Sequence, residues 1–201
     1  MSVFSNRMKL LAILALFVLP LGLAALMFSG KLPLFTGETV NQGKLIQPPF
    51  PLDWASAGSG TDLQSINELA GSWVILLPLP EFCTQECLNK LVGLRQVHRA
   101  AGREQHRIRL ALLTESPVTE ESQQKFLEIY AQFTLLTDPN QVLLPALQTV
   151  GKQHQLNTHN MTSYLVDPLG NIMMAYDMTD SETRMSKDLK RLLTWSKQDK
   201  G

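Results

Sequence analysis

The sequence predicts an α/β domain with a mixed sheet flanked by helices, preceded by one apolar N-terminal helix. An uninterrupted apolar run at 73–77 is typical of a strand that is buried on both faces. Helical and strand-like stretches alternate after it, which predicts right-handed crossovers between parallel strands. Turn residues at 168–171 separate two further strand-like stretches, which predicts a hairpin that adds an antiparallel edge to the sheet.

The elements of this domain are expected in the order β-α-β-α-β-α-β-β-α. Apolar runs bounded by turn residues predict strands at 73–77, 108–114, 133–136, 163–167 and 172–176. Apolar residues at helical spacing predict helices at 83–99, 119–130, 141–153 and 181–197. The side chains of the last helix expected to face the core are Met185, Leu189, Leu192, Leu193 and Trp195.

The N-terminal region predicts a membrane-spanning helix. Residues 10–28 carry no charge, and this length is enough to cross a hydrocarbon core of about 30 Å. Arg7 and Lys9 precede the run and Lys31 follows it, so the stronger positive flank is N-terminal. We therefore expect an uncleaved anchor with its short tail in the cytoplasm. The alternative is a cleaved signal peptide, for which Ala24 and Ala25 supply small residues.

These signals divide the chain into four predicted segments. They are a cytoplasmic tail at 1–9, a transmembrane anchor at 10–28, a linker at 29–60 and the α/β domain at 61–201. Part of the Pro-rich linker, at 45–54, could instead lie against the domain as an edge segment. The expected location is the bacterial inner membrane, with a single pass and the C-terminal domain in the periplasm.

The overall charge excludes one class of partner. The chain has 18 basic and 18 acidic residues, and it shows no basic stripe that would bind nucleic acid. Its two cysteines are too few for a disulfide-rich framework. The function is therefore expected to depend on a local site.

Cys83 and Cys87 are the candidate site. They follow the first strand and open the first helix, at the carboxyl end of a central strand where open α/β sheets place their sites. Thiols four residues apart share one helix face, where they can form a disulfide or hold a soft metal. This is a thioredoxin-like arrangement. Unpaired N–H groups at the helix start should stabilise a Cys83 thiolate, and Cys87 should be more covered.

One of the four histidines could join the two sulfurs. His159 lies in a polar loop directly before the strand at 163–167, and in a thioredoxin-like fold this loop approaches the cysteines. Two thiolates and one imidazole suit copper and, less distinctively, zinc. The other three, His98, His106 and His154, are interpreted as uninvolved surface residues.

These residues resemble the Sco/SenC family. The strand entry at 69–77 precedes Cys83-x-x-x-Cys87, and His159 stands five residues before the tyrosine of Tyr-Leu-Val-Asp-Pro-Leu-Gly. The resemblance extends over about 69–195. Members of that family are membrane-anchored, thioredoxin-fold copper proteins of cytochrome c oxidase assembly.

The resemblance implies that Cys83, Cys87 and His159 bind one copper ion, Cu(I) or Cu(II). It also implies partners: the inner membrane through the N-terminal helix, an oxidase subunit or another assembly factor, and a thiol reductant. The chain departs from the family pattern at Thr84 and Leu88, where prolines usually follow the cysteines. It therefore looks like a divergent member.

Three functions follow from these observations. The first is a copper-binding metallochaperone. The second is a thiol–disulfide oxidoreductase, in which Cys83 attacks and Cys87 resolves. The third is a non-catalytic interaction domain with a permanent disulfide. The loop at 157–163 contains no proline, whereas a thioredoxin usually has a cis-proline facing its thiols, so the sequence favours the metal site.

Overall fold

The structure of the protein is a computed structural model. It describes residues 6–28, 40–56, 58–59, 69–80, 83–115, 132–156, 161–177, 180 and 182–196. The chain divides into two compact units, 1–40 and 41–201, and each is considered by itself.

The first unit contains helix α1 (Asn6–Phe28), at the position where an apolar helix was expected. Its apolar side chains are exposed, as Leu10 and Leu16 illustrate. Across the described ranges, however, none of the helices combines the length and the apolar character needed to span a membrane. The predicted transmembrane anchor at 10–28 is therefore not confirmed.

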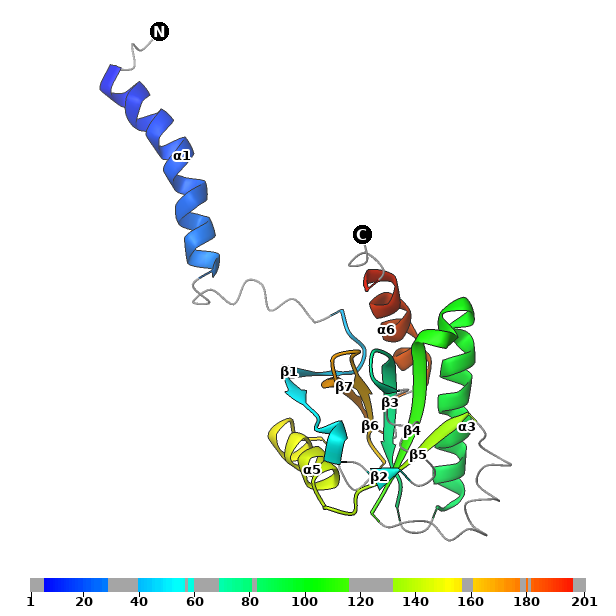
Figure 1. Ribbon diagram of the computed structural model, residues 1–201. Helices are drawn as coiled ribbons and strands as arrows, with labels where there is room; N and C mark the ends of the chain where they lie inside the picture. Colours follow the sequence, from blue (N-terminus) through cyan, green and yellow to red (C-terminus); the bar gives the residue numbers. More distant parts are fainter. Residues whose placement is uncertain are drawn as a thin grey trace. The chain divides into compact units, whose positions relative to one another are not determined.

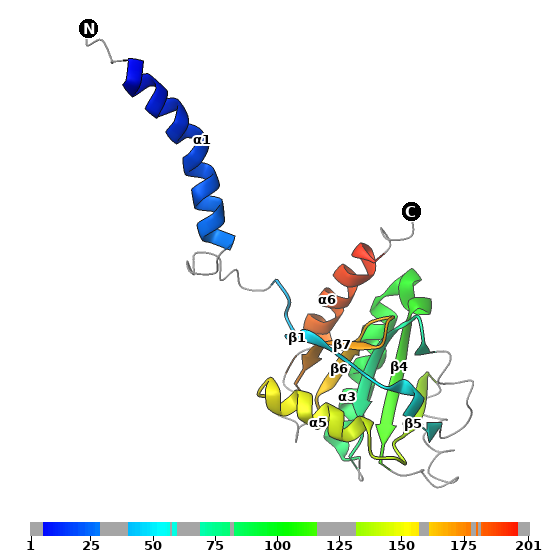
Figure 2. The same cartoon turned by 60° about the vertical axis from the view of Figure 1, so that its left-hand side comes forward.

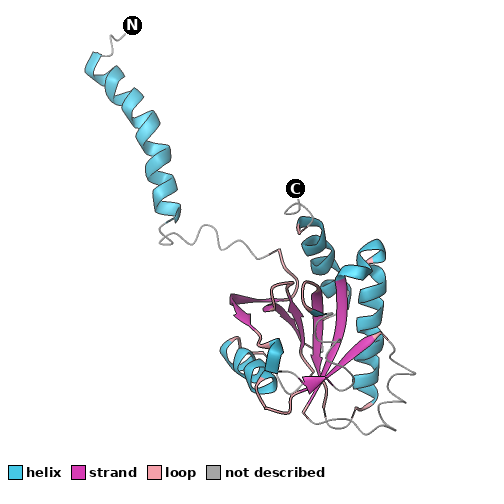
Figure 3. Ribbon diagram, in the orientation of Figure 1, coloured by secondary structure: helices cyan, strands magenta, loops and turns pink. Residues whose placement is uncertain are grey.

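The second unit is built on a mixed sheet (Figure 3). The described strands are β1 (Lys44–Pro51), β2 (Gly58–Ser59), β3 (Trp73–Pro78), β4 (Ile108–Thr114), β5 (Phe133–Thr137), β6 (Ser163–Val166) and β7 (Asn171–Tyr176). Their order across the sheet is β1-β7-β6-β3-β4-β5-β2. The central strands β3, β4 and β5 are parallel, and β6, β7, β1 and β2 pair antiparallel with their neighbours.

Helices cover both faces of this sheet (Figures 1 and 2). The described helices are α3 (Gln85–Ala100), α5 (Leu143–Gln153), α6 (Glu182–Trp195) and the short 3-10 helices η2 (Trp54–Ser56) and η3 (Gly102–Arg107). Helices α3 and α6 share one apolar cluster with the sheet, and α5 contributes to the cluster on the opposite face. The result is the expected three-layer α/β arrangement.

Strand β3 is the centre of both clusters. Ile75 and Leu77 face α3 and α6, whereas Val74 and Leu76 belong to the cluster that contains α5. All four are essentially inaccessible to solvent. The prediction of a strand buried on both faces is therefore confirmed.

The local turns explain why the elements end where they do. Pro78 and Pro80 close β3, since proline cannot donate to the sheet ladder. Gly102 follows α3 with a φ of +59°, which is the left-handed conformation common after a helix. In the β6–β7 turn, the Asp167 carboxylate accepts hydrogen bonds from the backbone N–H groups of Leu169 and Asn171, which confirms the hairpin.

Helix α6 follows its prediction except at its C-terminal end. Met185, Leu189 and Leu193 of α6 are buried at four-residue spacing, as predicted, but Trp195 is 71% exposed. Trp195 lies two positions beyond Leu193 and therefore points to a different side of the helix. The helix predicted at 119–130 lies outside the described residues.

Strand β1 lies inside the predicted linker, where 45–54 was the alternative edge segment. Residues 44–51 pair antiparallel with β7, so they belong to the sheet, and the compact unit begins at Asn41. The prolines of this strand are tolerated because β1 lies at the edge of the sheet, where one side needs no ladder partner.

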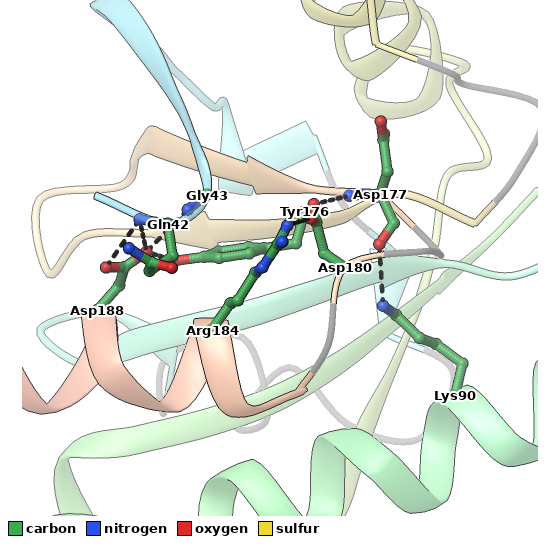
Figure 4. Close-up of polar contacts among 8 residues, drawn as sticks. All are labelled: Gln42, Gly43, Lys90, Tyr176, Asp177, Asp180, Arg184 and Asp188. Carbon is green, nitrogen blue, oxygen red and sulfur yellow. Dashed lines mark hydrogen bonds and ion pairs between the residues drawn. The ribbon is translucent and has the colours of Figure 1, made fainter. Parts of the chain in front are cut away.

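A buried carboxylate accepts hydrogen bonds from the backbone at the start of this unit (Figure 4). Asp188 of α6 is 2% exposed and accepts hydrogen bonds from the backbone N–H groups of Gln42, at 2.8 Å, and Gly43, at 2.9 Å. The Tyr176 hydroxyl donates a third, at 3.0 Å. Burial and the Asp188 carboxylate both raise the pKa of Tyr176. A side chain at Gly43 would overlap the Tyr176 ring, so the contact requires glycine there.

We expect Asp188→Ala to destabilise the 41–201 unit by about 2–4 kcal/mol, because it leaves buried donors without an acceptor. Lys190→Ala, on the exposed side of the same helix, should change the unfolding free energy by less than about 0.5 kcal/mol. Urea denaturation followed by circular dichroism measures both. Equal stability of the two variants would contradict this role for Asp188.

Candidate functional site

The candidate site lies at one edge of the sheet, where three strand ends meet. β6 is antiparallel to β3, with Leu76 opposite Tyr164, and β7 is antiparallel to β6, with Tyr176 opposite Ser163. The carboxyl ends of β3 and β7 and the amino end of β6 are therefore at the same edge. The first cysteine follows β3 at this edge, and α3 starts there.

Cys83 and Cys87 form a disulfide. Their Cα atoms are 5.2 Å apart, within the range that a disulfide bridges without backbone movement. Of the two outcomes that the sequence left open, a disulfide or a metal site, the structure shows the disulfide. Helix α3 begins at Gln85 rather than at Cys83, so Cys83 lies just before the helix and Cys87 in its first turn.

The two cysteines differ in solvent accessibility. Cys83 is partly exposed, whereas Cys87 is completely buried in the cluster beneath α3. Thr84 is the N-cap residue, and its side chain makes no hydrogen bond to the first turn of this described helix. The Thr84 side chain therefore does not compete with an anion beside Cys83 for the backbone N–H groups at the helix start. Glu86, in the first turn, disfavours an anion there.

His159 lies outside the described residues, as does all of 157–160. The chain resumes at Met161, which packs against the same apolar cluster as Cys83 and has a positive φ of 45°. Met161, which follows the loop that contains His159, therefore packs against the same core as the disulfide. Over the described ranges, no three His, Cys, Asp or Glu residues are grouped so that they could hold a metal ion.

One of the remaining histidines differs from its prediction. His98 is half-buried, and its Nε2 atom lies 3.2 Å from the Gln105 carbonyl oxygen. Burial lowers the pKa of His98. His98 is therefore part of the packing between α3 and η3 rather than an uninvolved surface residue. His106 is exposed, as expected.

The sequence interpretation missed Lys90, which is only 4% exposed. Its Nζ atom donates to the Asp177 carbonyl oxygen at 3.3 Å, and Figure 4 shows this contact. Burial lowers the pKa of Lys90, and the carboxylates of Glu182, Asp180 and Asp177 oppose that effect. The sequence feature that could have predicted the burial of Lys90 is its position three residues after Cys87, within the apolar stripe of the helix.

Asp177 connects three elements at this edge of the sheet. Its carbonyl accepts from Lys90 of α3, and its carboxylate accepts the Thr162 hydroxyl at 3.2 Å. Its backbone N–H donates to Asp180, at 2.9 Å, which also pairs with Arg184 of α6. Thr162, which follows the loop that contains His159, is thereby linked through Asp177 to α3, the helix of Cys87.

We expect the reduced domain to remain folded, with an unfolding free energy lower by about 2 kcal/mol. The cysteines close a very short loop, and a short loop removes little entropy from the unfolded chain. Denaturation with and without a phosphine reductant measures this difference, and the Cys83→Ala/Cys87→Ala variant should not respond to the reductant. Complete unfolding on reduction would identify the disulfide as a structural requirement instead.

Comparison with solved structures shows the fold. Yeast Sco1 with copper bound is 16% identical, with a TM-score of 0.50, and the match covers 63% of this chain and 80% of that one. Arabidopsis thaliana ScoI with copper bound is 14% identical, with a TM-score of 0.49 and coverage of 73% and 96%. A thiol:disulfide interchange protein from Bacteroides sp. is 15% identical, with a TM-score of 0.46 and coverage of 76% and 90%.

The expected likeness to Sco proteins is thus confirmed at the level of the fold, together with the divergence of this sequence from them. No curated protein matches the chain. One family model matches residues 73–196 of the 201, which includes the disulfide, the hairpin and α6. The chain therefore belongs to the family described as transmembrane-like, thioredoxin-like, C-terminal domain.

Proposed function

We propose that this protein is a copper-binding thiol redox protein in which the Cys83–Cys87 disulfide is the oxidised, metal-free state. The observation that carries the proposal is the disulfide itself, at the junction of a central strand and its helix, with one sulfur-bearing residue partly exposed. Reduction of this disulfide yields two sulfurs at the start of α3, one just before the helix and one in its first turn. Two such sulfurs are the soft ligands that copper prefers.

The two ligands that lie among the described residues, Cys83 and Cys87, are of a type that copper prefers. Cys83 and Cys87 supply two thiolates whose Cα atoms are already within 5.2 Å of each other. His159 is the proposed third ligand, and its support is the sequence spacing to Tyr164 together with the packing of Met161 on the disulfide core. Bound copper would supply the ability to change between Cu(I) and Cu(II).

Copper binding depends on the redox state and the protonation state of the chain's own ligand residues. The disulfide must accept two electrons, and each sulfur must lose its proton before it can bind a metal. The open helix start favours the thiolate of Cys83, and the apolar cluster around Cys87 excludes water from the second sulfur. His159 would have to be neutral.

The proposed location and the need for a reductant follow from the same chemistry, and the proposed recipient follows from the resemblance to Sco proteins. A disulfide persists in an oxidising compartment, which supports a location outside the cytoplasm, in the periplasm. There the protein requires a thiol reductant before it can take copper. The recipient that we propose is a cytochrome c oxidase subunit or another assembly factor, as the resemblance to Sco proteins implies.

Thiol–disulfide exchange without metal is the second candidate, and the unequal exposure of the cysteines favours it. Cys83 can be reached by a partner thiol, whereas Cys87 is buried and suited to resolve a mixed disulfide. The same reduced pair is required for both functions. They differ in the need for His159.

For the copper function, the reduced wild-type domain should bind one copper ion per chain, and His159→Ala should weaken binding by at least about tenfold because one ligand is lost. His106→Ala, a change of an exposed histidine, is the matched control and should bind as the wild type does. Titration of Cu(I) against a chromogenic competitor measures the affinity. Equal affinity of the His159→Ala variant would remove this residue from the site.

For the exchange function, Cys87→Ser should accumulate a mixed disulfide between Cys83 and a protein partner, because the resolving sulfur is absent. Non-reducing electrophoresis with mass spectrometry detects the product. The Cys83→Ser/Cys87→Ser variant is its control. A Cys87→Ser variant that traps no partner and shows no reductase activity would count against this candidate.

A further inference from the structure

The solvent-facing side of α6 carries charge of only one sign. Its exposed positions are two threonines, one tryptophan and four cations, and the cations are Arg184, Lys187, Lys190 and Arg191. The two carboxylates of this helix lie elsewhere, since Glu182 is partly buried and Asp188 is buried. We call the four cations the cationic face of α6. The charge of the whole chain, which is zero, does not reveal this face.

Contacts within the fold account for only part of this charge. Arg184 pairs with Asp180 at 2.9 Å. Among the described residues, Lys187 and Lys190 form no ion pair. The dipole of a helix favours cations in its last turn, but the last turn of α6 contains no basic residue. The two lysines are therefore placed to bind an anion outside the chain.

Cations of α3 and η3 extend this positive surface. Lys187 and Lys190 line a groove together with Ala100, the last residue of α3, and Figure 1 shows α6 beside this end of α3. Arg99 and Arg103 are exposed at the same end. The carboxylate nearest to them in the sequence, that of Glu104, pairs with Arg107 at 3.1 Å. This surface therefore keeps a strong excess of positive charge.

An exposed tryptophan ends the cationic face. Trp195 is 71% exposed and follows Arg191 by four residues, so the two side chains are neighbours on the helix surface. Tryptophan is enriched at membrane–water interfaces, where its amphipathic ring sits at the level of the headgroups. Lysine and arginine beside it attract anionic lipids. The same chain also exposes the apolar side chains of α1, which lipid would cover, and this favours lipid over an acidic protein.

We propose that the cationic face of α6, together with Trp195, binds the surface of a bilayer that contains anionic phospholipids. The ammonium groups of Lys187 and Lys190 contact lipid phosphates, and the indole ring lies among the headgroups. This contact does not depend on copper or on the redox state of the cysteines.

The contact has a consequence for the disulfide. Cys87 is in the first turn of α3, whereas the positive surface is beside its last turn. The helix has 16 residues and is therefore about 24 Å long. Binding of lipid at one end of α3 thus leaves the partly exposed Cys83, at the other end, open to a partner protein.

The test is acrylamide quenching of tryptophan fluorescence in the full chain, reconstituted at low salt in vesicles of phosphatidylcholine alone or with about one-third phosphatidylglycerol. Acrylamide remains in the water, so a tryptophan among the headgroups is protected. The quenching constant of the wild type should be at least about twofold lower with phosphatidylglycerol, and this difference should disappear at about 1 M salt, where the screening length is about 3 Å. Trp195→Phe should also remove the difference, which assigns it to this residue.

Two double variants with the same change in net charge test the role of the face. Lys187→Gln/Lys190→Gln should abolish the protection by phosphatidylglycerol. Lys44→Gln/Lys152→Gln should retain it, because Lys152 is an exposed residue of α5 and the Lys44 amino group points to the Gln155 carbonyl oxygen just after α5. Loss of protection in the first variant alone supports the inference.

Three results would overturn the inference while the proposed function stands. The first is equal quenching of the wild type in both kinds of vesicle. The second is protection that survives in Lys187→Gln/Lys190→Gln or is lost equally in the control variant. The third is protection of Trp195 by polyglutamate in detergent without protection by phosphatidylglycerol vesicles, which would assign the face to an acidic protein.

Discussion

The burial of β3 between two helical layers fixes the place of the two sulfurs. Alternate side chains of this strand belong to the apolar clusters on opposite faces of the sheet, so the strand can neither slip nor turn without exposing both sets. Its carboxyl end must therefore emerge at one edge of the sheet. Pro78 and Pro80 end the strand there, and Cys83 and Cys87 follow within one turn of the start of α3. The disulfide is a consequence of this placement.

Local patterns predicted most of the fold because they depend on neighbours in the sequence. The run at 73–77 predicted the central strand, and the turn residues at 168–171 predicted the hairpin. Lys44–Pro51 was harder to assign, because its three prolines are typical of a linker and only pairing with β7 makes it a strand. Trp195 was misplaced because its apolar character outweighed its spacing, which puts it on a different side of the helix from Leu193.

The candidate site could be predicted only in part for the same reason. The cysteine pair is local, and its spacing on a helix was enough to suggest a disulfide. The environment of Lys90 is not local, since it depends on residues from the β7–α6 connection that approach α3 only in the folded chain. Likewise, the buried Asp188 could be recognised only once Gln42 and Gly43 were seen to donate to it.

The proposed copper site consists of reduced Cys83 and Cys87 together with His159. X-ray absorption at the copper edge of the reduced, copper-loaded protein identifies the atoms that are bonded to the metal. We expect two sulfur neighbours and one imidazole nitrogen, with the nitrogen lost in His159→Ala. A shell of nitrogen and oxygen alone, or a spectrum that is unchanged in Cys83→Ser/Cys87→Ser, would contradict it.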